Sequence, residues 1–180
     1  ETPGQSKDLI TQLFDIHEKT AHTFLKNLGT EEGSKVLAHL ESRGLSRDTI
    51  KKFKLGYSLK QKDALLTAFR KEGVRSEAMK QSGLFIDTKG GYMDRFRGRI
   101  MFSIPNSSGK IAAFAGRVFE SDDTAKYVNS PETPIYNKSK ILYGLHETKQ
   151  IIRETKSVIV VEGYLDFLQL YQSGIHNIVA

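Results

Sequence analysis

The chain of 180 residues is 38% hydrophobic and 27% charged, and its 27 basic against 21 acidic residues give a formal net charge of +6. This balance is typical of a globular protein with one ordinary domain or two small ones, and no apolar run approaches the ~20 residues of a membrane span. The absence of cysteine excludes disulfide bonds and zinc sites with cysteine ligands.

The first third of the chain is expected to be helical. An apolar stripe of helical period follows the N-cap candidate Ser6 and stops at a glycine. Its members are Leu9, Leu13, Phe14, Phe24, Leu25 and Leu28, and the glycine is Gly29. Shorter amphipathic helices are expected at about 33–42, from Ser46 onward, at 62–72 and at 76–81, and glycines follow the first, third and fourth of them as stops.

Beyond residue 83 the pattern changes from helices to strands and turns. Residues 84–86 and 92–96 flank a glycine-containing loop, which is typical of a β-hairpin. Residues 100–104 and 111–119 flank the turn sequence Pro-Asn-Ser-Ser-Gly and form a second expected hairpin. We therefore expect a small mixed or antiparallel sheet behind the helical part.

Almost all of the net positive charge lies between residues 89 and 117. This window contains six cations against one acid, Asp94, which gives a net charge of +5. Such a concentration is the electrostatic footprint of a nucleic-acid binder, whereas the simpler alternative is a solvated face of an edge strand. The aromatic neighbours Tyr92, Phe96 and Phe102 favour the nucleic-acid interpretation.

The arginines of this window follow the alternation of a strand. Arg95, Arg97 and Arg99 recur with period 2, so an extended segment would carry all three on one face and turn Phe96 to the other. Arg117 stands at the end of an otherwise apolar strand, where an unpaired charge needs an acidic partner or a function.

Residues 120–140 show little regular pattern, and we interpret them as an ordered functional loop between the sheet and the C-terminal part of the chain. A helix is expected at about 145–155. A boundary near residue 156 then divides the chain into an N-terminal α+β part, residues 1–156, and a second part, residues 157–180.

The last segment, 157–180, carries the most specific signal. Residues 157–161 form a continuous β-branched run, which predicts a fully buried, parallel strand. A helical pattern from Tyr164, with Gly174 as its stop, leads to a second short strand at 177–180.

Two carboxylates accompany this strand-turn-helix unit. Glu162 follows the strand at its carboxyl end, where open α/β sheets bind ligands, and Asp166 lies one helical turn further on. Paired carboxylates suit a divalent metal such as Mg²⁺ or a proton-transfer task. The alternative is structural: an acidic residue in the first turn favours the helix dipole, and Gly163 relieves a tight turn.

The sequence Val161-Glu-Gly-Tyr-Leu-Asp166 after a hydrophobic strand resembles the opening motif of the TOPRIM fold of bacterial, DnaG-type DNA primases. Further blocks resemble the same family and occur in its order along the chain. They are 43–46, 95–105, 114–117, 126–133, 136–138 and 142–145. The resemblance thus extends from about residue 43 to the last residue.

The resemblance implies an α+β fold: a helical N-terminal part with a small mixed or antiparallel sheet, followed by the first β-α-β of a TOPRIM fold. The family's zinc-ribbon domain, the downstream Asp-x-Asp pair of the TOPRIM fold and the helicase-binding domain are expected to lie outside this chain. The stretch would then be the front half of a catalytic core, and by itself it is expected to make no primers.

The activity that the resemblance implies is that of a DNA primase, a DNA-directed RNA polymerase (nucleotidyltransferase) that makes short RNA primers on single-stranded DNA for replication. Glu162 would be catalytic, and Asp166 is the next catalytic candidate. Glu162 would also bind Mg²⁺ or Mn²⁺, whose other ligands would lie beyond this chain, and no zinc site is expected. The resemblance places a template-and-nucleotide groove on Arg43, Arg95, Arg97, Arg99, Arg117, Lys126, Tyr127, Asn129 and Lys138. Arginine suits phosphate through its planar fork and lysine acts as a point charge, whereas Tyr127 and Asn129 suit a base or a sugar.

The implied partners are a single-stranded DNA template, nucleoside triphosphates, the RNA primer and, through a domain absent here, the replicative helicase of the primosome. No membrane association is expected, and the lack of an export signal together with the resemblance predicts a cytoplasmic protein. Two alternatives stay open: another TOPRIM enzyme, such as a topoisomerase or nuclease, or a non-catalytic module that binds single-stranded DNA and has a structural Glu162. The block at 126–133 argues against the first, because other TOPRIM enzymes should lack it.

Overall fold

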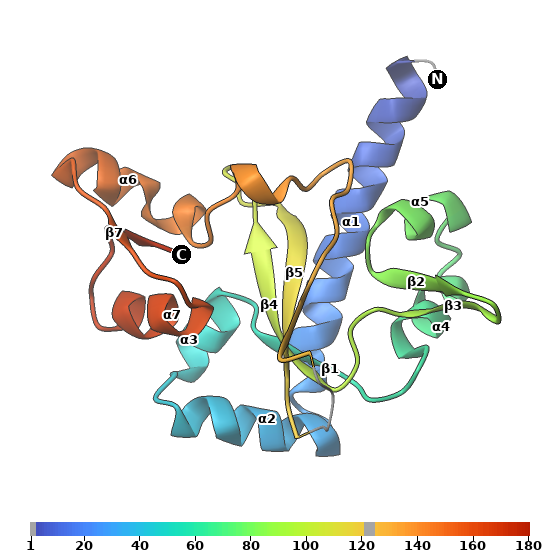
Figure 1. Cartoon of the computed structure of the whole chain (residues 1–180), viewed down its shortest axis with the longest axis horizontal. Coiled ribbons are helices and arrows are strands. Elements are labelled where there is room, and N and C mark those ends of the chain that lie inside the picture. Colours follow the sequence, from blue (N-terminus) through green and yellow to red (C-terminus); the bar gives the residue numbers. More distant parts are fainter. Residues whose placement is uncertain (1–2, 121–124) are drawn as a thin grey trace.

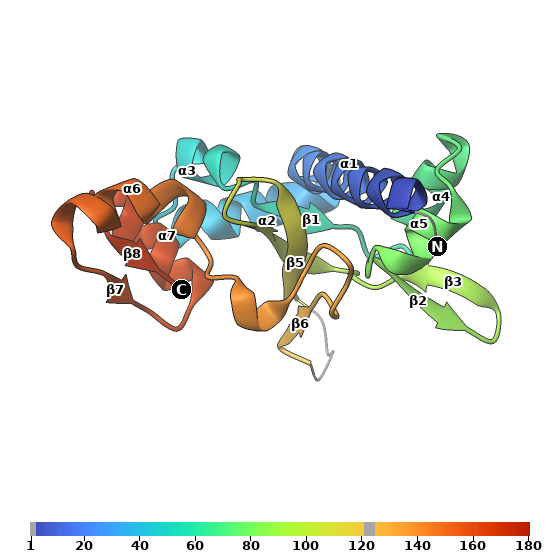
Figure 2. The ribbon, with the colours of Figure 1, turned by 90° about the horizontal axis from the view of Figure 1, so that it is seen from above.

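The computed structural model describes residues 3–120 and 125–180. Its centre is a four-stranded antiparallel sheet of order β1-β4-β5-β6 (Figures 1 and 2). The strands are β1 (Gly56–Ser58), β4 (Arg99–Pro105), β5 (Ile111–Val118) and β6 (Tyr127–Asn129). The turn between β4 and β5 is closed by Asn106, whose side-chain oxygen accepts hydrogen bonds from the N–H groups of Ser108 and Lys110 at 2.9 and 3.1 Å. This confirms the second expected hairpin.

The first expected hairpin is confirmed as well. β2 (Phe85–Thr88) and β3 (Gly91–Asp94) pair antiparallel and form a separate two-stranded sheet. Together with α4 (Ala64–Lys71) and α5 (Ser76–Gln81), they lie on one side of the central sheet in Figure 1.

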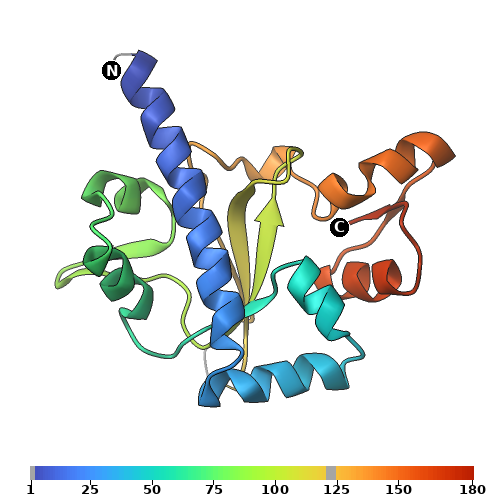
Figure 3. The same cartoon turned by 180° about the vertical axis from the view of Figure 1, so that it is seen from behind.

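The long helix α1 (Pro3–Asn27) covers one face of the central sheet, as Figure 3 shows. The ring of His17 stacks on Phe114 of β5 with 5.5 Å between the centroids, and Phe24 meets the same ring edge-on. Burial lowers the pKa of His17 to about 4, so this histidine is a neutral core residue. The helix begins at Pro3, so the N-cap expected at Ser6 is wrong.

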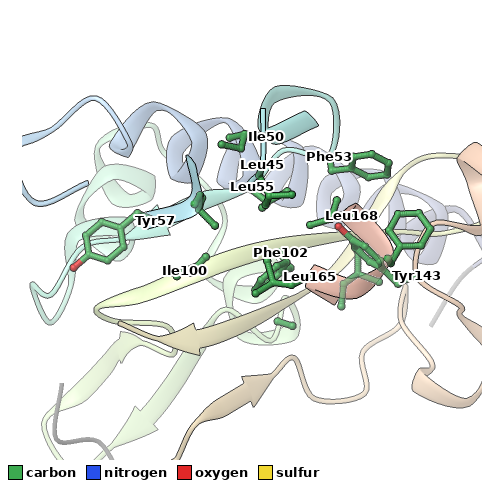
Figure 4. Packing of buried hydrophobic residues seen from close by; sticks show 14 of the residues in the cluster. Leu45, Ile50, Phe53, Leu55, Tyr57, Ile100, Phe102, Tyr143, Leu165 and Leu168 are labelled. Atoms are coloured by element: carbon green, nitrogen blue, oxygen red, sulfur yellow. The ribbon is translucent and has the colours of Figure 1, made fainter. Parts of the chain in front are cut away.

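The opposite face of the sheet packs against helices from both ends of the chain. These helices are α2 (Glu31–Ser42), α3 (Arg47–Lys52) and α7 (Tyr164–Gln172), with α6 (Leu145–Thr155) beside α7. Figure 4 shows the core that results, in which Phe102 of β4 and Leu165 of α7 lie together and Tyr143 is close by. Residues from both sides of position 156 therefore share one hydrophobic core. None of the helices in the described ranges combines the length and the apolar character that crossing a bilayer demands.

The last part of the chain forms the expected β-α-β unit. Its strands β7 (Ile159–Val160) and β8 (Ile178–Val179) pair in parallel. The expectation that the first strand is fully buried is wrong, because Val158, Ile159 and Val160 are 47%, 41% and 69% exposed. Figure 2 shows β7 at the outer edge of this unit. Within the described chain β7 is paired with β8 alone, so its apolar side chains have few neighbours to cover them.

Residues 120–140 contain more regular structure than the sequence predicts. β6 pairs with β5, η1 (Lys138–Lys140) is a short 3₁₀ helix, and Thr133 forms an isolated bridge with Tyr136. Part of the expected loop, 121–124, lies outside the described residues. β6 is missed because three residues are too few to display an alternating pattern.

Candidate nucleic-acid interface and catalytic carboxylate

Glu162 stands in the turn between β7 and α7, and its side chain is exposed. The N–H of Phe167 donates to the carbonyl of Gly163 at 3.0 Å and starts the helix there. A Cβ added at Gly163 would lie 2.6 Å from Oδ2 of Asp166, so glycine leaves the space in which this carboxylate folds back over the turn. Asp166 lies in the first turn of α7, where a negative charge favours the helix dipole.

Three of the expected binding residues lie on one face of the central sheet. In the register of β5 and β6, Arg117 is paired with Tyr127 and Ala115 with Asn129. β4 places Phe102 opposite Ala115 on the other side. Paired residues of antiparallel strands point to the same face. Arg117, Tyr127 and Asn129 therefore share the face that carries Phe102.

Phe102 connects this face with the Glu162 turn. Its ring stacks on Tyr164, the first residue of α7, with 5.2 Å between the centroids and 28° between the planes. Burial, together with the neighbouring Tyr136 and Tyr127, raises the pKa of Tyr164 to about 12. The sheet face and the turn thus border one region, although they come from distant parts of the sequence.

Two polar groups of this sheet face make no hydrogen bond with the described residues. Arg117 is half-buried, and its guanidinium forms neither a hydrogen bond nor an ion pair with residues 3–120 or 125–180. Oδ1 of Asn129 is buried and also lacks a partner within those ranges. A buried acceptor without a partner costs about 1–3 kcal/mol, so its presence favours a site that a ligand completes.

Arg99 is used inside the fold. Its side chain is 2% exposed, and its guanidinium donates to the carbonyls of Gly116 at 3.3 Å and Ala125 at 2.9 Å. These bonds fix the chain directly before Lys126. In this structure Arg99 supports the strand that carries other candidate residues.

The common face expected for Arg95, Arg97 and Arg99 is not formed, because the chain bends between β3 and β4 and is not extended there. Arg95 donates from Nε to the carbonyl of Gly83 at 2.8 Å, and burial lowers its pKa. Arg97 donates to the carbonyl of Asp94. Both residues are half-buried.

Asp94 anchors this bend to α4. Its side chain is 4% exposed, and its carboxylate accepts the N–H groups of Leu65 at 2.8 Å and Leu66 at 3.0 Å. Burial raises the pKa of Asp94 to about 6, although the two N–H groups and Arg97 act in the opposite direction.

This raised pKa predicts a pH-dependent stability. An unperturbed aspartate has a pKa of about 4, so the folded chain binds the Asp94 proton more tightly than the unfolded chain does. The resulting stabilisation is fully present below about pH 4 and is lost as the pH rises through about 6. Between about pH 4 and pH 7, the free energy of unfolding should therefore fall by about 2 kcal/mol more in the unsubstituted chain than in Asp94→Asn. Urea unfolding of both proteins measures this difference, and parallel pH curves would contradict it.

Arg43, Lys126 and Lys138 are exposed and lie on separate segments. Arg43 follows the last residue of α2, Lys126 precedes β6, and Lys138 is the first residue of η1. Beside η1 the surface is hollowed, and residues 132–137 line the hollow together with Lys140 and Ile141.

Sequence reasoning misses the role of Tyr164, which it treats as the first apolar position of a helix. The structure shows this side chain as the contact between the sheet face and the turn. Its place directly after Glu162-Gly163, at the ligand-binding edge of an α/β unit, is the signal that could have identified it.

The described residues contain no group of three or more carboxylate, histidine or cysteine side chains that could hold a metal ion. Glu162 nevertheless offers an exposed carboxylate. Mg²⁺ often takes one or two such ligands and completes its shell with waters and phosphate oxygens. The donor chemistry of the turn therefore fits Mg²⁺ or Mn²⁺ as a partial protein site.

Residues 23–149 match the family described as the DNA primase catalytic core, N-terminal domain. A DNA primase of Pseudomonas putida is 43% identical over 183 aligned residues, which cover 100% of this chain and 27% of that protein. The chain thus spans about a quarter of the length of the curated relatives that it matches.

Solved structures have the same architecture. The RNA polymerase domain of the Mycobacterium tuberculosis primase DnaG superposes with a TM-score of 0.89 at 29% identity, over 94% of this chain and 56% of that one. A DnaG primase catalytic domain bound to single-stranded DNA superposes with a TM-score of 0.85 at 34% identity, over 97% of this chain and 56% of that one.

Proposed function

Because this chain belongs to the family of DNA primase catalytic cores, we propose that it is the template- and nucleotide-binding part of a DNA primase, which makes short RNA primers on single-stranded DNA. Membership confirms the resemblance carried by the sequence blocks, and the α+β fold is shared with solved members. The names of the relatives favour this activity over another TOPRIM enzyme or a non-catalytic binding module.

The observation that carries the proposal is the stack of Phe102 on Tyr164. It brings the sheet face with Arg117 and Tyr127 to the same region as the Glu162 turn. A template-directed polymerase needs this combination, because polyanionic substrates must be held beside the group that assists the chemistry.

Each side chain of the sheet face suits one part of a nucleotide. Arg117 would bind two phosphate oxygens through its planar guanidinium. The ring of Tyr127, 41% exposed, would stack on a base, and Oδ1 of Asn129 would accept a hydrogen bond from a base or a sugar hydroxyl. Arg43, Arg95, Arg97, Lys126 and Lys138 would bind further phosphates of the template or the nucleotide. Arg99 would act through the strand that it fixes.

Primer extension is the attack of a 3′-hydroxyl on an α-phosphate with loss of pyrophosphate. Glu162 would accept the proton of the attacking hydroxyl or serve as a ligand of Mg²⁺ or Mn²⁺. Such an ion supplies Lewis acidity at the phosphate when it is bound. Asp166, in the first turn of α7, would be the second carboxylate for the same work.

The wider setting follows from the same proposal. The solved primase catalytic domain with bound single-stranded DNA supports a single-stranded template here. Nucleoside triphosphates and the RNA primer are the further proposed ligands, the replicative helicase is the proposed protein partner, and the cytoplasm is the proposed location. We place the boundary between the two functional parts near residue 156.

We expect the chain to bind single-stranded DNA with a strong dependence on salt. For single strands, each neutralised phosphate adds about −0.7 to the slope of log K against log salt. Replacing both Arg97 and Arg117 by alanine should therefore flatten the slope by about 1.4. Fluorescence anisotropy of a labelled oligonucleotide, titrated at several salt concentrations between about 50 and 200 mM, measures the slope.

The matched control removes the same charge elsewhere. Arg70 on α4 and Arg153 on α6 are exposed, and alanine at both positions lowers the net charge equally. The control should keep the original slope. An affinity that does not change with salt, or an equal flattening in both double variants, would contradict a binding face that contains Arg97 and Arg117.

A further inference from the structure

Three hydrogen bonds connect α7 with the loop between α2 and α3. Nε2 of Gln169 donates to the carbonyl of Arg43 at 2.7 Å, and Nε2 of Gln172 donates to that of Gly44 at 2.8 Å. The N–H of Ser46 donates in return to Oε1 of Gln172 at 2.7 Å. The partners are separated by 126 or 128 residues in the sequence, so these bonds join the two ends of the chain.

The loop presents these backbone groups because of the way α2 ends. The N–H of Gly44 returns to the carbonyl of Glu41 at 2.9 Å and that of Leu45 to Leu40 at 3.1 Å, which closes the helix. The carbonyls of Arg43 and Gly44 then lie beyond the helical ladder and need other donors. The amide of Gln172 donates one hydrogen bond and accepts another. Ionised glutamate cannot donate and leucine can do neither, so neither residue would reproduce these contacts.

α3 adds a further contact to the same helix. Nζ of Lys52 donates to the hydroxyl of Tyr171 at 2.6 Å and lies 4.7 Å from the centroid of its ring. The ring of Phe53 meets Tyr171 edge-on at 5.0 Å. The segment from Arg43 to Phe53 is therefore held against α7 along its length.

α7 is also the helix that starts at the Glu162 turn. At 1.5 Å per residue, Gln169 lies about 8 Å along α7 from Tyr164, the first residue of the helix, and only Gly163 separates Tyr164 from Glu162. Arg43 itself points its side chain to solvent. The clamp formed by Gln169 and Gln172 thus fixes the position of the Arg43 backbone relative to Glu162.

We propose that Gln169 and Gln172 are positioning residues that hold Arg43 at a fixed position relative to Glu162. The phosphate bound by Arg43 would then be aligned with the reacting group beside Glu162. This inference rests on the proposed function of both residues. The apolar contacts of Leu45, Phe53 and Leu168 already join the two parts of the chain. The three hydrogen bonds are exposed and add little net stability, so their main effect is orientation.

The test is a double-mutant cycle in a primase of the relatives' length that carries this chain. Gln169→Ala with Gln172→Ala should lower kcat for primer synthesis by about tenfold, since small misplacements of aligned groups are costly. The Kd for single-stranded DNA should stay within about twofold, because a released Arg43 still reaches phosphate. When they are combined with Arg43→Ala, the two glutamine substitutions should cause no further loss of kcat, because the glutamines act through Arg43.

The matched control is Gln150→Ala on α6, whose amide bonds only within its own helix, to Glu154 at 2.9 Å, among the described residues. It should leave kcat unchanged. Three outcomes would contradict the proposed role of the clamp. They are additive losses of kcat in the cycle, a fall in melting temperature that accounts for the loss of activity, and an unchanged kcat. An Arg43→Ala variant that is as active as the unsubstituted enzyme would instead remove Arg43 from the proposed function, and the clamp with it.

Discussion

Glutamine in place of Glu162 is expected to abolish primer synthesis and to leave single-stranded DNA binding nearly unchanged. The substitution keeps the size and the hydrogen-bonding reach of the side chain but removes the charge that binds a metal or accepts a proton. Loss of an acid–base group lowers kcat by about 100-fold or more. A group that acts only in the transition state contributes nothing to ground-state binding, so the Kd for DNA should not change.

Primer yield, DNA affinity and melting temperature must be measured together, in a primase of the relatives' length that carries this chain. The matched control is Glu154→Gln, which changes an exposed glutamate of α6 in the same way. Asp166→Asn should lose less activity than Glu162→Gln, because Asp166 lies against Gly163 in the first turn of α7 and not at the strand end. If Glu162→Gln gave the same primer yield as the unsubstituted enzyme, Glu162 would not be a catalytic residue. A lower melting temperature with retained yield would indicate a structural role.

Local patterns predict most of the helices because the forces that end a helix are local. α5 and α6 have the predicted bounds, 76–81 and 145–155, and α7 ends directly before Ser173 and the predicted stop at Gly174. In each case the stop depends on residues within one turn of the helix end.

Burial of a strand depends on neighbours that no local pattern reveals. Residues 157–161 have the apolar run of a buried strand, yet the described chain provides β7 with one neighbouring strand, and Ile159 and Val160 stay 41% and 69% exposed. Arg99 shows that the direction of a side chain is equally hard to predict from a local pattern. Period 2 holds only while the chain stays extended, and the bend after Asp94 turns Arg99 into the core.

The candidate site is predictable where it follows a motif. Glu162 stands at the turn that the strand-Glu-Gly-helix pattern predicts, and the sheet pairing brings Arg117 beside Tyr127. The clamp by Gln169 and Gln172 has no such signal. Their partners are backbone carbonyls, which every residue has, so only the folded chain shows which carbonyls they reach.

Alanine in place of Gly144 should cause a large loss in the free energy of unfolding. Gly144 precedes α6 with φ +81, and a Cβ there would lie 2.1 Å from Cζ and 2.2 Å from Cε2 of Phe167. Phe167 is completely buried, and its ring meets Phe53 and Tyr143 edge-on. A Cβ does not fit so close to a ring that packs against two others, so we expect a loss of about 3 kcal/mol in the free energy of unfolding.

Gly174→Ala is the matched control, because it separates the collision from the backbone strain. Gly174 has φ +98, but a Cβ there would have no heavy atom within 4 Å. It should therefore lose only about 1 kcal/mol, the cost of alanine in the left-handed region. Urea unfolding of both variants measures the difference. Phe167→Leu should recover part of the Gly144→Ala loss by removing the ring, and so make the two substitutions less than additive. Equal losses at Gly144 and Gly174, or full additivity with Phe167→Leu, would show that strain and not the ring decides the effect. A collision confirmed in this way would show that the start of α6, at Gly144, packs directly against Phe167 of α7.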